Sequence, residues 1–175
     1  MKVLVTGGVR SGKSKHAEGL LAGTPAVTYV APGPTAEEEP DPDWAARLEA
    51  HRSRRPAGWT TLESRDLAGA LALEGPVMVD CLGTWLSAVL DQAEAWERPS
   101  REVQALVGER LDAAVEALAA AQGPVVLVTN EVGLGVVPAH RSGRLFRDLL
   151  GTANQSLAAA CDEVHLVVAG RVLRL

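Results

Sequence analysis

Short apolar segments alternate with longer helical patterns along this chain. The apolar runs, rich in valine, lie at 2–6, 26–31, 59–62, 77–80, 125–129 and 164–169. Most of them are continuous rather than alternating, as expected for strands that are covered on both faces of a sheet. After Gly170, the short tail 171–175 can add a hairpin partner to the last strand.

Helical patterns fill most of the segments between these strands. The clearest helix is predicted at 101–122, where apolar residues recur on one face. We expect Ser100 to cap its beginning and Gly123-Pro124 to end it. Shorter helices are predicted at 13–22, 43–53, 64–73, 82–90 and 139–160. This alternation of strands and helices predicts a three-layer α/β fold with a mainly parallel sheet.

Length and composition fit one domain that spans residues 1–175. Hydrophobic residues make up 47% and charged residues 22% of the chain, which is ordinary for a globular protein with its own core. The net charge of −5 argues against a broad surface for nucleic acid. The proline-rich acidic segment 32–42 is interpreted as a loop within this domain.

The location of the protein is predicted from its cysteines and its apolar runs. The apolar runs are only as long as strands, so no membrane span is expected. Cys81 and Cys161 lack the spacing of metal ligands, and no secretory segment is recognised, so both are expected to be reduced, buried thiols. We therefore expect a soluble, cytoplasmic protein.

The first predicted strand runs directly into a glycine-rich phosphate-binding loop. Residues 7–14 read GGVRSGKS, which matches G-x-x-x-x-G-K-S, the P-loop pattern. Glycine at positions 7 and 12 lets backbone N–H groups turn toward a phosphate. Lys13 adds a positive charge for the β- and γ-phosphates, and the Ser14 hydroxyl can ligate Mg²⁺. A chance match is the alternative, but strand, loop and helix occur in the required order, which favours nucleotide binding.

Polar residues also follow other predicted strands, at the edge of the sheet where ligands of such folds bind. Asp80 ends one strand and is interpreted as a second Mg²⁺ ligand, with capping of the next helix as the alternative. Glu63 can accept hydrogen bonds from a guanine edge or a ribose, or it can favour a helix N-terminus, and both interpretations stay open. Residues 129–133 are expected at the same edge, but they lack the lysine and aspartate of the N-K-x-D motif of switch GTPases.

His51 is the histidine with the most unusual surroundings. It lies among four arginines, Arg47, Arg52, Arg54 and Arg55. Such neighbours favour a neutral, nucleophilic imidazole and can stabilise an anionic substrate and a pyrophosphate leaving group. The residue pattern alone still favours a solvated basic helix face with an incidental histidine. The other histidines, at positions 16, 140 and 165, have no ligand spacing and are interpreted as structural.

Six segments in order make the chain similar to a known family. They are GGVRSGKS at 7–14, RLEAHRSRRPAGWTTLE at 47–63, DCLGTWL at 80–86, TNEVGLGVVP at 129–138, RLFRDLLGTANQ at 144–155 and CDEVHLVVAGRVLRL at 161–175. Together they resemble the bifunctional adenosylcobinamide kinase / adenosylcobinamide-phosphate guanylyltransferase family of cobalamin biosynthesis. The resemblance implies a P-loop NTPase fold, RecA-like, with one antiparallel strand in its sheet and assembly as a homotrimer.

The same resemblance implies two reactions and a set of site residues. Adenosylcobinamide is phosphorylated by ATP or GTP, and GMP then passes from GTP through a histidine to adenosylcobinamide phosphate. The position of that histidine is His51, which reverses the interpretation from the residue pattern. Lys13 is the other expected catalytic residue, and Mg²⁺ is expected at Ser14 and Asp80. The implied nucleotide contacts are Gly7, Gly8, Val9, Arg10, Ser11, Gly12, Lys13, Ser14, Ala31, Pro32, Gly33, Arg52, Ser53, Arg54, Arg55, Glu63 and Asp80.

The chain departs from the family pattern at three places. Pro32 replaces a usual threonine and removes an N–H, Trp44 stands where methionine is usual, and Ala88 replaces an asparagine. These departures leave a kinase with a single function as one alternative, in which His51 only binds phosphate. A nucleotide-gated module that contacts RNA through its arginines is a second alternative, which the acidic net charge disfavours.

Overall fold

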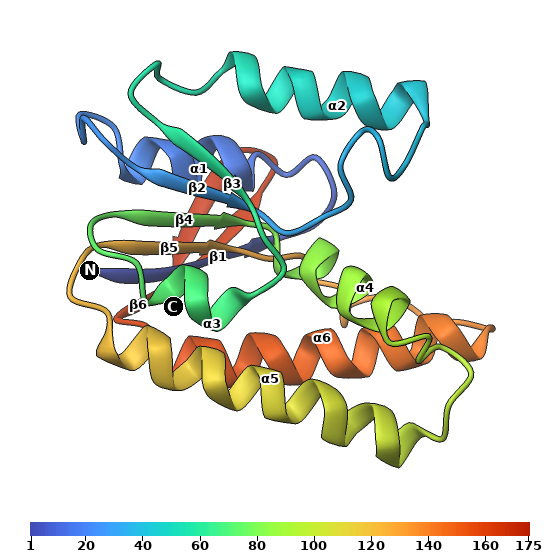
Figure 1. The fold of residues 1–175 in the computed structure, drawn as a ribbon. Helices are drawn as coiled ribbons and strands as arrows, with labels where there is room; N and C mark the ends of the chain where they lie inside the picture. The colour runs from blue at the N-terminus through green and yellow to red at the C-terminus, as the bar shows by residue number, and fades with distance from the viewer.

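The computed structural model describes residues 1–175, except for the side chain of Arg47. Helices and strands alternate through most of the chain, as the apolar pattern predicts (Figure 1). The strands are β1 (Lys2–Gly7), β2 (Thr28–Ala31), β3 (Thr60–Glu63), β4 (Val77–Asp80), β5 (Val125–Val128), β6 (Glu163–Val168) and β7 (Arg171–Arg174). The helices are α1 (Lys13–Leu20), α2 (Pro42–Ser53), α3 (Leu67–Leu71), α4 (Leu82–Gln92), α5 (Ser100–Ala120) and α6 (Arg141–Ala159).

The strands described here join one sheet in the order β3-β2-β4-β5-β1-β6-β7. Every neighbouring pair is parallel except β6 and β7, which form an antiparallel hairpin around Gly170. The prediction of a mainly parallel sheet with an antiparallel partner after the last long strand is therefore confirmed. Because β1 to β5 run in the same direction, their carboxyl ends meet at one edge of the sheet.

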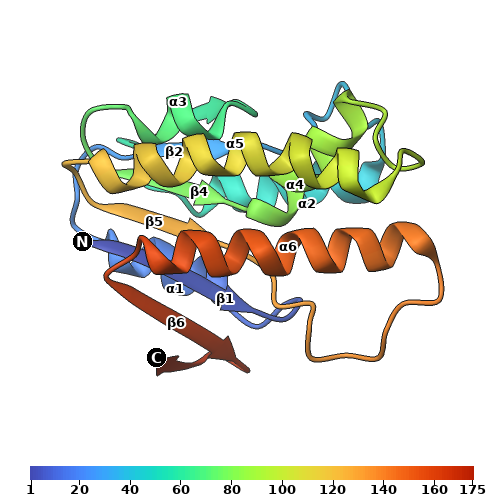
Figure 2. The ribbon, with the colours of Figure 1, turned by 90° about the horizontal axis from the view of Figure 1, so that it is seen from below.

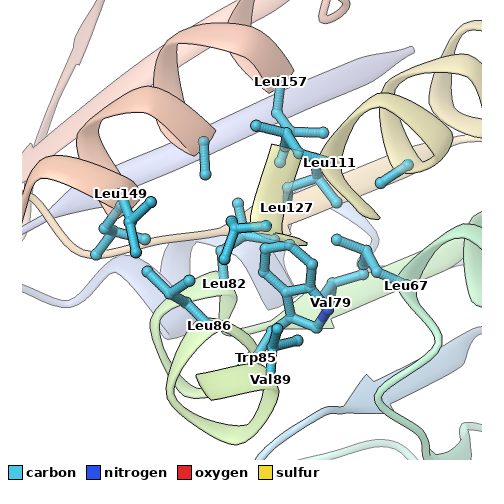
Figure 3. Close-up of a cluster of buried hydrophobic side chains, with 14 of the residues drawn as sticks. Leu67, Val79, Leu82, Trp85, Leu86, Val89, Leu111, Leu127, Leu149 and Leu157 are labelled. Carbon is cyan, nitrogen blue, oxygen red and sulfur yellow. The ribbon is translucent and has the colours of Figure 1, made fainter. Parts of the chain in front are cut away.

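Helices cover both faces of the sheet. Figures 1 and 2 show α5 and α6 side by side on one face, with α3 and α4 beside them, while α1 lies on the other face. The larger core lies under α3 to α6 and includes Trp85, which is 1% exposed and is surrounded by leucine and valine side chains (Figure 3). A smaller core lies between the sheet and α1 and includes Ala17 and Tyr29.

Two helices begin at other residues than predicted, for local reasons. The N–H groups of Glu102 and Val103 donate to the Pro99 carbonyl, so α5 begins at Ser100 and Ser100 does not cap it. The helix predicted at 64–73 is only Leu67–Leu71, because the Asp66 side chain accepts from the Gly69 N–H and caps the helix there.

Cys81 and Cys161 are less buried than expected, and two of the histidines interpreted as structural contact each other. Cys81 and Cys161 are free thiols but only partly buried, and burial raises the pKa of Cys161 to about 11.

His16 Nε2 lies 2.9 Å from His165 Nδ1, although 149 residues separate them. This contact ties α1 to β6. The remaining ring nitrogen of His165 contacts the carboxylate of Glu163, in the same strand, at 2.8 Å. Among the described residues, no helix is long and apolar enough to cross a bilayer.

Candidate active site

A cavity of about 230 Å³ opens at the edge of the sheet where β1 to β4 end. The loop after β1, the ends of β2, β3 and β4, the helix α2 and Asn130 after β5 all contribute to its wall. Polar residues that are far apart in the sequence therefore meet because their strands are parallel. This is the edge at which ligands bind in open α/β sheets.

The P-loop connects β1 to α1 at this edge. A Cβ on Gly7 would lie less than 3.0 Å from the Val167 carbonyl oxygen, and Gly12 has a positive φ of 97°. The Gly170 N–H donates to the Ser11 carbonyl at 2.8 Å, so the β6–β7 turn supports the loop. Lys13 is buried except for 9% of its surface, and its Nζ donates to the Gly8 carbonyl at 3.1 Å. The loop thus holds the ammonium group of Lys13 beside its own backbone, as phosphate binding requires.

Ten of the residues predicted for the site line the cavity. They are Val9, Lys13, Ser14, Ala31, Gly33, His51, Arg52, Arg55, Glu63 and Asp80. The other predicted residues do not line it, namely Gly7, Gly8, Arg10, Ser11, Gly12, Pro32, Ser53 and Arg54. Pro32 is buried, and the Ser53 hydroxyl bonds back to the Ala50 carbonyl within α2. The structure therefore gathers the three residues on which the predicted chemistry depends, Lys13, His51 and Asp80.

Asp80 lies against both His51 and Tyr29. The Tyr29 hydroxyl donates to Asp80 Oδ2 at 3.1 Å, and His51 Nδ1 lies 3.7 Å from the same oxygen. The side chain of Asp80 is 7% exposed and that of His51 is 24% exposed. Burial, followed by the charge of Asp80, raises the pKa of Tyr29, so its hydroxyl keeps its proton.

The arginines around His51 have separate partners. Arg52 pairs with Glu63 at 2.7 Å, and Arg54 pairs with Glu18 of α1 at 3.1 Å. Arg55 reaches three groups: its Nε donates to the His51 carbonyl, its Nη1 donates to Thr61 Oγ1, and its guanidinium lies 3.9 Å from the centre of the Tyr29 ring. These contacts fasten the end of α2 to β2, β3 and α1. The side chain of Arg47 lies outside the described part of the structure.

The helix-capping alternatives for the two carboxylates are not supported by their surroundings. The end of α4 that follows Asp80 is capped by Thr84, whose hydroxyl oxygen lies 3.4 Å from the Cys81 N–H. Asp80 therefore does not cap that helix. Asp66 rather than Glu63 caps α3, and Glu63 ends β3 in the wall of the cavity. Both carboxylates face the candidate site.

The residue pattern did not identify Tyr29 and Thr61 as site residues. Both line the cavity from β2 and β3. Tyr29 is the only tyrosine of the chain, and it lies two residues before Ala31 on the same face of its strand. That alternation is the signal that could have identified it. Asn130, which was expected to open onto this edge, does line the cavity.

Comparison with known proteins shows the family of this chain. Residues 3–175 match the family described as cobinamide kinase / cobinamide phosphate guanyltransferase. The chain belongs to this family. It is 40% identical to the bifunctional adenosylcobalamin biosynthesis protein CobU of Salmonella typhimurium and to its namesake in Escherichia coli, over 97% of both chains in each case. It is 41% identical to the bifunctional adenosylcobalamin biosynthesis protein CobP of Pseudomonas aeruginosa, over 97% of this chain and 94% of the relative.

Membership of this family establishes the reactions. The chain is a bifunctional adenosylcobinamide kinase and cobinamide-phosphate guanylyltransferase of cobalamin biosynthesis. Both the kinase with a single function and the RNA-contacting module are therefore set aside. The P-loop fold expected from the resemblance is confirmed as well.

Proposed function

We propose that one cavity serves both reactions and that His51 carries GMP between GTP and the corrinoid phosphate. The observation that carries this proposal is the meeting of Lys13, Asp80 and His51 around a single cavity. A nucleotide held by residues 7–14 could present its γ-phosphate to a corrinoid hydroxyl or its α-phosphate to the imidazole. Residues 7–14 then bind the triphosphate in both reactions.

In the kinase reaction, Lys13 would stabilise the charge that develops on the transferred phosphoryl group. Ser14 and Asp80 supply a hydroxyl and a carboxylate to the same cavity, and Mg²⁺ prefers oxygen ligands of this kind. No cluster of three or more acidic, histidine or cysteine side chains fit to hold a metal ion occurs among the described residues. An ion at Ser14 and Asp80 would therefore be shared with the nucleotide phosphates, whose charge it would neutralise.

In the guanylyl transfer, a ring nitrogen of His51 would attack the α-phosphorus of GTP. The new N–P bond replaces the bond to the bridging oxygen, and pyrophosphate leaves with that oxygen and its electron pair. An oxygen of adenosylcobinamide phosphate then attacks the same phosphorus, the N–P bond breaks, and the imidazole is restored. The histidine thereby divides one difficult transfer into two easier ones.

The arginines suit the guanylyl transfer because they surround the nucleophile. Arg52 and Arg55 line the cavity and offer guanidinium groups to the phosphates and to the leaving pyrophosphate. His51 already lies in the cavity wall in this structure, so a movement of α2 is not required to bring it to the sheet edge. The nucleotide contacts expected at Glu63, Ala31 and Gly33 are retained as part of the proposal.

Assembly and location are proposed from the family resemblance. We expect a homotrimer, which the molar mass in solution would test directly. Several exposed apolar side chains could be covered in such an assembly, among them Leu134, Val136 and Leu173. Nucleoside triphosphates are substrates of the cytoplasm, and we expect the enzyme to act there.

The proposal is tested with GTP that carries ³²P at the α-phosphate. The wild-type enzyme is incubated with this GTP and Mg²⁺, and protein-bound label is measured after denaturation in base and in acid. We expect label that survives base and is lost in acid, as a phosphorus–nitrogen bond requires, together with release of pyrophosphate. His51→Ala should bind no label, whereas His140→Ala, at an exposed histidine that does not line the cavity, should label as the wild type does.

The same preparations are then given adenosylcobinamide, and the products are identified by mass. The wild type should form the phosphate and then the GDP derivative, while His51→Ala should stop at the phosphate. Acid-labile label on His51→Ala, or formation of the GDP derivative by that variant, would show that another residue carries GMP.

A further inference from the structure

A segment without helix or strand, residues 129–140, joins β5 to α6 beside the cavity. Asn130 lines the cavity, and the Glu131 N–H donates at 3.1 Å to the carbonyl of Gly7, the first residue of the P-loop. The Asn130 carbonyl accepts from Asn154 Nδ2 of α6, also at 3.1 Å. In Figure 2 the rest of the segment extends outward from the carboxyl ends of the strands before the chain turns back into α6. The segment therefore begins at the P-loop and leads away from it.

Exposed apolar side chains gather in this segment. Leu134, Val136 and Val137 are 87%, 95% and 63% exposed. Val9 of the P-loop lines the cavity and is itself 76% exposed. Single exposed apolar residues are ordinary on a protein surface. Three of them within four positions, on a segment that begins at an active-site cavity, indicate a surface for a ligand.

Two arginines of α6 fix the main chain on both sides of these apolar residues. Arg147 donates to the carbonyls of Gly133 and Gly135, at 3.2 and 3.4 Å. Arg144 donates to two carbonyls that follow the apolar residues, at 3.1 and 2.7 Å. A surface that is ordered before its ligand arrives loses less conformational entropy on binding. The segment is therefore built as a binding surface rather than as a loose connection.

The size of the cavity decides which part of the substrate stays outside it. Pockets that hold a whole drug-sized ligand usually have volumes of roughly 300–1,000 Å³. The cavity here has only about 230 Å³ and must already accept the nucleotide. The corrin macrocycle of adenosylcobinamide is larger than a drug-sized ligand, so only the arm that carries the hydroxyl can enter. The macrocycle must then lie against the rim of the cavity.

The proposed nucleotide contacts decide which side of the rim is free. Ala31, Gly33 and Glu63 lie at or just after the ends of β2 and β3, so the nucleoside occupies that side of the cavity. The side at the end of β5 is left for the corrinoid, and there Asn130 leads into the apolar segment. The corrin ring carries methyl groups along its edge, which complement apolar side chains.

We propose that Leu134, Val136 and Val137 form the docking surface for the corrin macrocycle of adenosylcobinamide, with Val9 at the cavity end of that surface. This inference deepens the proposed function and rests on its placement of the nucleotide. The macrocycle packs on these side chains, while its hydroxyl arm passes Asn130 and enters the cavity. Both reactions use the same surface, because adenosylcobinamide and its phosphate carry the same macrocycle. Burial of apolar area supplies the affinity.

The test uses the double variant Leu134→Ser, Val136→Ser, since both side chains are too exposed to support the fold. We expect the KM for adenosylcobinamide in the kinase reaction to rise roughly tenfold to hundredfold, because two apolar contacts are lost. The maximal rate and the KM for the nucleotide should change by less than about twofold. Leu73→Ser is the matched control, because Leu73 is an exposed leucine in the turn that leads into the amino end of β4, away from the cavity. Its KM for adenosylcobinamide should equal that of the wild type.

The contact is observed directly by NMR of enzyme with ¹³C-labelled leucine and valine methyl groups. Loss of signals in the single variants assigns Leu134 and Val136. Adenosylcobinamide added without nucleotide should shift these signals, whereas GTP alone should leave them in place. Signals that respond to GTP and not to the corrinoid would show that the segment contacts the nucleotide instead, and the inference would be wrong.

Two results of the kinetic test would also overturn the inference. One is a KM for adenosylcobinamide in the double variant that stays within about twofold of the wild-type value. The other is a lower molar mass of the double variant in solution, because the segment would then be an interface between copies of the chain.

These outcomes are separate from failure of the proposed function. Labelling by α-³²P GTP alone needs no corrinoid, so the double variant should label as the wild type does. If His51→Ala still acquires acid-labile label, the proposed role of His51 is wrong, whatever the KM for adenosylcobinamide does. If only His51 is labelled while the double variant keeps the wild-type KM, the role of His51 stands and the docking surface is wrong.

Discussion

The P-loop depends on one position where two main chains approach too closely for a side chain. Gly7 ends β1 and is paired with Val167 of β6. A Cβ at Gly7 would lie less than 3.0 Å from the Val167 carbonyl oxygen and 2.7 Å from Ser11 Oγ, whereas ordinary contact begins at 3.4 Å. Val167 is also paired with Val172 of β7, so its main chain cannot move without disturbing two strands. We therefore predict that Gly7→Ala strains the sheet as well as the loop.

The cost of Gly7→Ala should be about 2 kcal/mol, the usual range for an overpacked site being roughly 1–3 kcal/mol. This is a large part of the 5–15 kcal/mol or so that stabilises a typical domain. With a urea slope of about 2 kcal/mol per M, the unfolding midpoint should fall by about 1 M. Unfolding is followed by circular dichroism at equal protein concentrations, because any association would shift the midpoint.

Gly8→Ala is the matched control for this prediction. Gly8 lies in the same loop, its φ is not positive, and a Cβ there would meet no atom within 4 Å. Its free energy of unfolding should therefore stay within about 0.5 kcal/mol of that of the wild type. Equal midpoints for Gly7→Ala and Gly8→Ala would refute the argument from close approach.

Three further predictions follow from the core, from the paired histidines and from Arg55. Trp85→Ala should lower the free energy of unfolding by about 3–5 kcal/mol, because the buried indole fills the larger core, and urea unfolding measures this. Burial and the neighbouring His165 lower the pKa of His16 below its usual value near 6.5, so the stability that this site contributes is complete above that pH and is lost as the pH falls below it. Thermal unfolding between pH 7 and 5 should therefore show a smaller decline for His16→Gln than for the wild type or for His140→Gln. In Arg55→Lys, the lysine cannot reach both the His51 carbonyl and Thr61. Up to about 2 kcal/mol of the interactions that hold the end of α2 in place is then lost, and the rate of GMP labelling measured by quenched flow should fall by as much as roughly 30-fold. An unchanged rate would show that Arg55 does not hold the end of α2.

Local sequence signals predicted the parts of the site that depend on local structure. The P-loop could be located because the glycines, the lysine and the serine have a fixed spacing between a strand and a helix. Asp80 and Glu63 could be placed at the sheet edge because each lies at the end of a predicted strand. The orders of strands and helices followed from the alternation of apolar runs and helical patterns.

Contacts between distant segments could not be predicted in this way. Tyr29 meets Asp80 only because β2 and β4 are neighbours in the sheet, although α2, β3 and α3 separate them in the sequence. His16 meets His165 because α1 lies over β1 and β6, which are neighbours in the sheet. No spacing rule joins residues 149 positions apart. The proposal that His51 is the nucleophile needed the family resemblance, because a histidine among arginines also fits a solvated helix face.

The central claim is that GMP bound to His51 is an intermediate of the reaction. The most direct measurement isolates the enzyme labelled from α-³²P GTP, removes free nucleotide, and maps the labelled peptide by mass spectrometry under basic conditions. The labelled enzyme is then mixed with adenosylcobinamide phosphate, and transfer of label is followed in time. We predict that the label lies on His51 and moves to the corrinoid at least as fast as the enzyme turns over. Label on another residue, or label on His51 that moves more slowly than turnover, would contradict it.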